Sequence, residues 1–146
     1  MNFTKDRFYI STEKEKMDIE LIHSFLTHSY WAEGISKEIV RRSIDGALCF
    51  GVFENDKQVG FARMITDRAT FAYLADVFII EEYRGLGLSK WLIEVIMSHP
   101  DLRGLRRFML ATRDAHELYK KFGFTQLNNV DRWMHIHYPD VYKVIK

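Results

Sequence analysis

One unit of the sequence restricts the fold of this chain more than any other. It is an apolar, extended stretch that leads into a Gly-Leu-Gly turn, and a helix follows the turn. Residues 70–80 read as a largely apolar strand, and residues 88–96 carry apolar side chains at helical spacing. Such a strand–turn–helix unit points several backbone N–H groups and the positive end of the helix dipole at one place, which suits phosphate oxygens. Gly85 and Gly87 allow the backbone angles of such a turn, and Arg84 adds positive charge at its rim. The residues expected around the phosphates are Arg84, Gly85, Leu86, Gly87, Leu88, Ser89 and Lys90.

Two glycines alone also fit an ordinary strand-to-helix turn. The Gly-Lys-Ser/Thr of a P-loop is missing, and position 90 is Lys where a dinucleotide-binding fingerprint has its third glycine. If the turn binds phosphate, it therefore does so neither as a P-loop nor as a dinucleotide-binding fingerprint.

The order of predicted elements is typical of a mixed α/β domain with three layers. Apolar spacing predicts helices that begin after Asp18 and after Ser36, and a later helix capped by Asp114 and closed by Gly123. Extended runs predict strands at residues 48–53, 58–66, 70–80, 108–112 and 134–137. Because the chain has 146 residues and no linker or repeat, we expect a single domain, 1–146.

Composition narrows the possible partners and the compartment. There are 21 basic and 20 acidic residues, so the net charge of +1 argues against a nucleic-acid binder and a polybasic membrane anchor. Cys49 is the sole cysteine and lies in an apolar run, which predicts a buried structural thiol. The N-terminus lacks a signal peptide pattern, and the apolar stretch 71–80 is too short to span a bilayer. We therefore expect a cytoplasmic protein.

Two motifs make a family resemblance specific. Residues 76–79 read Asp-Val-Phe-Ile, and residues 84–89 read Arg-Gly-Leu-Gly-Leu-Ser. Residues 115–124 read Ala-His-Glu-Leu-Tyr-Lys-Lys-Phe-Gly-Phe. These stretches resemble the acetyl-CoA signature and the Ala-x-x-Leu-Tyr-x-x-x-Gly-Phe signature of the GNAT superfamily of N-acetyltransferases. The resemblance extends over roughly residues 8–137.

The resemblance implies a three-layer α/β/α fold with a mostly antiparallel sheet that splays at the acetyl-CoA site. It implies that backbone groups near Phe78 and Ile79 hold the pantetheine arm, and that Tyr119 protonates the leaving thiolate. The chain also departs from the pattern. Thr112 stands where an Asn often binds the cofactor arm, and Ala75 stands where many relatives carry a Glu that serves as the general base.

The expected chemistry needs a neutral amine and a proton for the departing thiolate. An alkyl amine with a pKa near 10.4 is almost wholly protonated at pH 7, so a base or desolvation of the amine must help. Asp76 is the first candidate for the general base or for the group that anchors the amine. The alternative is that this carboxylate, buried on a strand, only accepts hydrogen bonds from neighbouring backbone or hydroxyl groups. Tyr119 is the candidate proton donor. The alternative role for Tyr119 is that of a tyrosine packed in the core with its hydroxyl hydrogen-bonded.

The acceptor region is predicted between the first two helices and on the strands beside the cleft. Tyr30 and Trp31 supply aromatic rings there, while Arg63 and Tyr73 lie on neighbouring strands. Alternation along the strand places Tyr73 on the same face as Ala75 and Ile79.

We therefore expect an enzyme that transfers an acetyl group from acetyl-CoA to a primary amine of a small molecule by direct attack in a ternary complex. Two alternatives stay open: a protein amine as acceptor, and a CoA-binding regulatory module without catalysis. We predict no metal site, and His135 and His137 read as a surface pair. A homodimer is possible through the aromatic C-terminal part around Trp133, Tyr138 and Tyr142.

Overall fold

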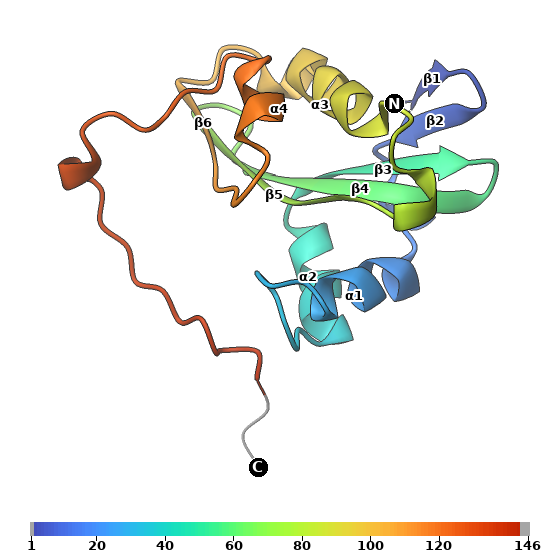
Figure 1. Ribbon diagram of the computed structural model, residues 1–146, viewed down its shortest axis with the longest axis horizontal. Helices are drawn as coiled ribbons and strands as arrows, with labels where there is room; N and C mark the ends of the chain where they lie inside the picture. Colours follow the sequence, from blue (N-terminus) through green and yellow to red (C-terminus); the bar gives the residue numbers. More distant parts are fainter. Residues whose placement is uncertain (1, 144–146) are drawn as a thin grey trace.

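Six strands form one sheet in which spatial order follows chain order (Figure 1). The computed structural model describes residues 2–143. All neighbouring strands are antiparallel except the last pair, which is parallel. The strands are β1 (Asn2–Lys5), β2 (Phe8–Ser11), β3 (Leu48–Glu54), β4 (Lys57–Thr66), β5 (Phe71–Ile79) and β6 (Arg107–Leu110).

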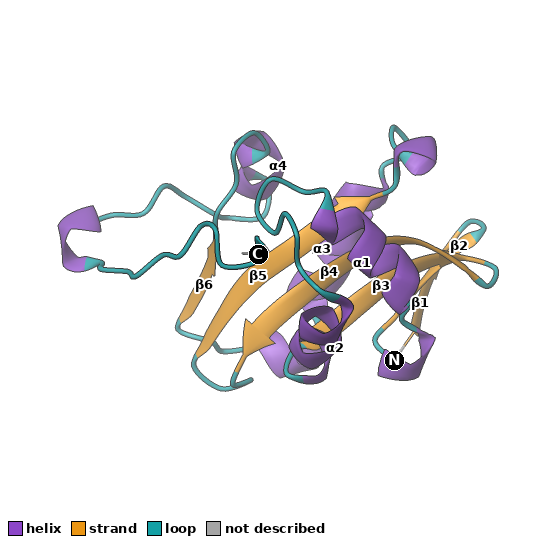
Figure 2. Cartoon of the chain, turned by 90° about the horizontal axis from the view of Figure 1, so that it is seen from below, coloured by secondary structure: helices purple, strands orange, loops and turns teal. Residues whose placement is uncertain are grey.

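Helices cover both faces of this sheet, α1 and α2 on one and α3 and α4 on the other (Figures 1 and 2). Asp18 and Ser36 cap the first two, because each side chain accepts the N–H three residues ahead. The helices are α1 (Ile19–Thr27), α2 (Lys37–Asp45), α3 (Leu88–Ser98) and α4 (His116–Lys120), with short 3-10 turns at Lys14–Lys16, Glu81–Tyr83, Pro100–Leu102 and Val130–Arg132. The predicted mixed α/β architecture is confirmed.

Each face of the sheet has its own core. One core joins α3 to side chains such as Leu74 and Ile79, and the other joins α1 and α2 to side chains such as Phe61 and Phe78. Cys49 is fully buried in the second core, and burial raises the pKa of its thiol to about 11. The prediction of an inert, structural thiol is confirmed.

Two predictions about local structure are wrong, and two short strands were not predicted. Residues 134–137 form no strand, because no neighbouring strand pairs with them in the described chain. Asp114 does not cap α4; the Thr112 hydroxyl takes the Ala115 N–H instead, at 3.0 Å. The sequence reading also missed β1 and β2, which are only four residues long each. Within residues 2–143, no helix is long and apolar enough to cross a membrane.

Candidate active site

A β-bulge in β5 sets the geometry of the site. Phe61 of β4 pairs with Phe78 and Arg63 pairs with Ala75, so two steps along β4 oppose three along β5. Asp76 lies inside this bulge with a φ of 57°, a left-handed conformation that Asp tolerates better than most side chains. The bulge bends the strand at the first residue of the motif.

The bulge reverses which face later residues of β5 occupy. Leu74 and Ile79 both belong to the α3 core although they are five residues apart, a spacing that places side chains on opposite faces of a regular strand. Tyr73, next to Leu74, therefore lies on the α1–α2 face. The prediction that Tyr73 and Ile79 share a face is wrong, because alternation does not continue through the bulge.

Past the bulge, β5 separates from β6. Pairing of the two strands ends at Leu74 and Leu110, whereas β5 continues to Ile79. The Ile80 N–H donates to Val59 O, so the register turns the N–H and C=O of Ile79 away from β4 and toward this gap. The same register turns the backbone N–H and C=O of Phe78 toward β4, and the contact of Phe78 with a pantetheine arm stays a prediction. The N–H and C=O of Ile79 line one edge of the gap, where they can form hydrogen bonds with the amide groups of an extended ligand.

The Gly-rich turn fits an anionic group. Gly85 and Gly87 have φ values of 82° and 79°, and a Cβ built on either would meet no atom within 4 Å. Gly87 is the N-cap of α3 and supplies no side-chain acceptor, so the N–H groups of the first helical turn have no intrahelical partner. Arg84 lies at the inner rim, where its Nε donates to Ile79 O at 3.0 Å. Open space, the N–H groups of the first helical turn and positive charge meet at one point, a geometry that suits a pyrophosphate.

Tyr119 is buried on α4, and Thr112 lies near the start of that helix. Burial raises the pKa of this phenol, and the nearby Tyr30 phenol adds to the rise. The hydroxyl is therefore a protonated group at neutral pH.

Asp76 joins two of the predicted acceptor residues. Trp31 Nε1 donates to its Oδ1 at 2.8 Å, and Arg63 Nε donates to its Oδ2 at 2.9 Å. The Asp76 side chain is only 8% exposed, so this carboxylate is shared between two donors in a partly dry environment. The structure thus brings together Trp31, Arg63 and Asp76, which are far apart in the sequence.

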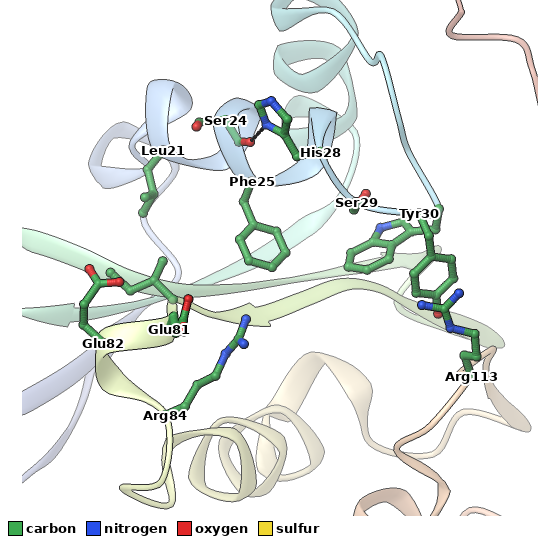
Figure 3. A pocket seen from close by; sticks show the side chains of 12 residues that line it. Leu21, Ser24, Phe25, His28, Ser29, Tyr30, Glu81, Glu82, Arg84 and Arg113 are labelled. Carbon is green, nitrogen blue, oxygen red and sulfur yellow. Dashed lines mark hydrogen bonds between the residues drawn. The ribbon is translucent and has the colours of Figure 1, made fainter.

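A pocket of about 710 Å³ lies between α1 and the Gly-rich turn (Figure 3). Tyr30 and Trp31 contribute to its wall and stack edge to face at 5.1 Å. Arg113, which sequence reasoning missed, places its guanidinium 3.8 Å from the centroid of the Tyr30 ring. Its signal was an arginine directly after the predicted strand 108–112. The lining residues are Leu21, Ser24, Phe25, His28, Ser29, Tyr30, Trp31, Ile80, Glu81, Glu82, Arg84 and Arg113.

Tyr73 and Arg63 do not line this pocket. Tyr73 of β5 pairs with Ile65 of β4, and Arg63 lies two residues before Ile65 on the same face of β4. Tyr73 and Arg63 therefore both lie on the α1–α2 face of the sheet. Within residues 2–143, no group of three or more His, Cys, Asp or Glu side chains is arranged to hold a metal ion.

Two features of this fold lie side by side: the gap between the parallel strands β5 and β6, and the Gly-rich turn at the start of α3. Together they define a class of fold that binds an extended donor molecule with phosphate groups. Residues 8–124 match the acetyltransferase (GNAT) family. A crystal structure of a protein assigned to the GNAT family from Xanthomonas campestris pv. campestris is 47% identical and has a TM-score of 0.93, covering 97% of this chain and 100% of that one. A Gibberella zeae protein named as an acetyltransferase is 29% identical over an alignment 143 residues long, and the match covers 82% of this chain and 80% of that protein.

A Clostridium acetobutylicum protein named as a predicted acetyltransferase was solved with acetyl-CoA. It is 15% identical to this chain and has a TM-score of 0.64, covering 94% of this chain and 96% of that one. At that identity the likeness shows the fold alone. The family match over most of the chain decides the matter: the chain belongs to the GNAT family of acetyltransferases. It is an acyltransferase that uses acetyl-CoA as its acetyl donor.

Proposed function

We propose that this enzyme transfers the acetyl group to a primary amine of a small molecule by direct attack. The observation that carries the proposal is the pocket of about 710 Å³, a size that suits a small ligand. Trp31 offers an aromatic face to a cationic amine, whereas Arg113 already covers one face of Tyr30. The carboxylates of Glu81 and Glu82 line the other end of the pocket, close to Arg84 (Figure 3). The Gly-rich turn adjoins this pocket through Arg84, so donor and acceptor meet there.

In the reaction the neutral amine nitrogen attacks the thioester carbonyl carbon, and the carbon–sulfur bond breaks. The departing thiolate takes a proton from the Tyr119 phenol, the attacking nitrogen loses one proton to solvent, and solvent returns a proton to the Tyr119 phenolate. A thiol has a pKa near 8.5, so transfer from a phenol whose pKa is raised by burial is uphill and lowers the barrier only modestly. Orientation of the two bound reactants supplies the larger part of the rate.

We assign Asp76 to anchoring and not to proton abstraction. Both of its oxygens accept hydrogen bonds, one from the Trp31 indole and one from the Arg63 guanidinium, so the carboxylate is engaged by two side chains of the protein. Through these bonds Asp76 fixes the indole of Trp31 against the pocket and keeps Arg63 from reaching toward a cationic acceptor. Deprotonation of the amine is then left to desolvation in the aromatic pocket.

A panel of small primary amines, with free CoA thiol measured as product, tests this function. We expect turnover with some amines and none with lysine-containing peptides; turnover with the peptides alone would favour a protein acceptor. Acetyl-CoA binding without turnover on any amine would favour a regulatory module.

Calorimetry tests the donor site separately. Gly87→Trp fills the turn and should abolish acetyl-CoA binding. Gly104→Trp is the matched control, because Gly104 has a φ of 77° and equally open surroundings but lies in the loop before β6. Equal loss of binding in both variants would contradict the assignment of the turn.

A further inference from the structure

Tyr83 lies directly before the Gly-rich turn and joins it to a hairpin that is distant in the sequence. It is the last residue of the 3-10 turn Glu81–Tyr83, and Arg84 follows it. The Tyr83 hydroxyl donates a hydrogen bond to Oε1 of Glu54 at 2.7 Å. Glu54 is the last residue of β3, at the hairpin that leads into β4. One side chain therefore connects the start of the turn to a part of the sheet 29 residues earlier in the chain.

Glu54 is itself held by a second partner. Arg7, in the turn between β1 and β2, donates from its Nε to Oε2 of Glu54 and forms an ion pair with it. The hydrogen bond from Tyr83 and the contact with Arg7 lower the pKa of the Glu54 carboxyl, which is therefore charged at neutral pH. Hydrogen bonds to a charged acceptor are stronger than those between neutral groups. The Tyr83 hydroxyl is thus bound to a fixed and charged partner.

The Tyr83 ring is fixed as well as its hydroxyl. It meets the Phe8 ring edge to face, with the centroids 6.0 Å apart and the ring planes at 84°. The Lys57 ammonium lies 5.3 Å from the centroid of the Tyr83 ring. Phe8 belongs to β2, Glu54 to β3 and Lys57 to β4, so the side chain of Tyr83 contacts three strands of the sheet.

The turn that follows Tyr83 has few contacts of its own. A Cβ built on Gly85 or Gly87 would meet no atom within 4 Å, and Leu86 between them is 49% exposed. The next buried side chain is that of Leu88, in the first turn of α3. The anchors that precede the turn therefore control where its backbone N–H groups lie.

Two side chains anchor the start of the turn, and they differ in one respect. Arg84 donates to Ile79 O, an atom that lines the gap between β5 and β6. A donor amide that bonds to Ile79 O competes with Arg84 for that oxygen. Tyr83 bonds to Glu54, and neither residue lines the gap or the pocket beside it. The Tyr83 anchor therefore stays intact while the donor is bound.

We propose that Tyr83 is a positioning residue for the acetyl donor. Its bond to Glu54 holds the Gly-rich turn in the arrangement that binds a pyrophosphate before the donor arrives, so the turn loses little conformational freedom on binding. Tyr83 contacts neither substrate and acts through the N–H groups of the turn. The inference rests on the assignment of this turn to the pyrophosphate of acetyl-CoA, and it does not depend on the acceptor.

Calorimetry with acetyl-CoA tests the role of the hydroxyl. Tyr83→Phe removes the hydroxyl and keeps the ring, and we expect the Kd for acetyl-CoA to rise about 10-fold, the effect of one hydrogen bond to a charged group. Adding Tyr83→Phe to Glu54→Ala should weaken binding no further, because both changes remove the same bond. Tyr9→Phe is the matched control: Tyr9 lies next to Phe8 on β2, points to the opposite face and stacks on Phe53 at 5.1 Å, so this variant should bind as wild type.

A donor without a pyrophosphate separates positioning from a general disturbance of the fold. S-acetylpantetheine ends before the pyrophosphate, so its Kd, measured by competition, should be the same for wild type and Tyr83→Phe. An equal loss of affinity for both donors, or no loss for either, overturns the positioning role. Loss of acetyl-CoA binding in Gly87→Trp with unchanged binding in Tyr83→Phe also overturns it and leaves the donor site in place. Unchanged binding in Gly87→Trp would contradict the assignment of the turn itself.

Discussion

The guanidinium of Arg113 lies 3.8 Å from the centroid of the Tyr30 ring, and this contact joins the loop after β6 to the loop after α1 (Figure 3). Both residues line the pocket and lie together at one end of it. A cation–π contact at an exposed position contributes about 0.5–1 kcal/mol.

We therefore expect Arg113→Ala and Tyr30→Ala to be coupled. A double-mutant cycle on the free energy of unfolding should give a coupling of about 0.5–1 kcal/mol, and each variant should raise the KM for the acceptor. Arg7→Ala removes a comparable contact to Phe8, 4.6 Å from the ring and away from the pocket, and should leave KM unchanged. Additive effects in the cycle would contradict this contact.

Tyr119→Phe removes the proposed proton donor and leaves the ring in place. We expect kcat to fall by about 10-fold, below the usual range for a general acid because the proton transfer is uphill, while the Kd for acetyl-CoA stays the same. Burial raises the pKa of Tyr119 above its ordinary value of 10.0, so the wild type should keep this donor up to at least pH 10. A loss of rate near pH 8 in wild type that Tyr119→Phe abolishes would contradict this assignment.

Asp76→Asn tests the anchor between Trp31 and Arg63. The amide keeps the tolerance for a positive φ but loses the charge, so we expect a loss of about 1–3 kcal/mol in the free energy of unfolding. We also expect a higher KM for the acceptor and no change in acetyl-CoA affinity. Asp76→Gly separates backbone from side chain: if its relaxed φ restores stability, backbone strain and not the shared carboxylate controls this position.

His99 makes the fold sensitive to mild acid. The ring is buried and its Nδ1 accepts the Asp101 N–H at 3.1 Å, and burial lowers the pKa of His99 below 6.5. A lowered folded-state pKa gives stability that is present above pH 6.5 and lost as the pH falls through the folded pKa. We expect urea midpoints to fall between pH 7 and pH 5, and to fall less in His99→Asn. His116→Asn, at an exposed position, should behave as wild type.

Local chemistry was readable from the sequence where neighbouring residues decide the structure. The caps at Asp18 and Ser36, the Gly-rich turn at Gly85 and Gly87, and the meander of three strands all depend on residues close in the chain, and all are confirmed. The two family motifs were readable for the same reason, and through them the acetyl donor.

Residues far apart in the chain decided the rest. Alternation predicted the wrong face for Ile79, because the bulge at Asp76 depends on pairing with β4. The ties from Asp76 to Trp31 and Arg63 join three separate elements. The period-two pattern of residues 134–137 predicted a strand that the structure does not contain, since a strand forms only where a partner edge pairs with it. Sequence thus determined each element's local preference and the donor chemistry, whereas long-range pairing, which carries no local signal, decided the shape of the site.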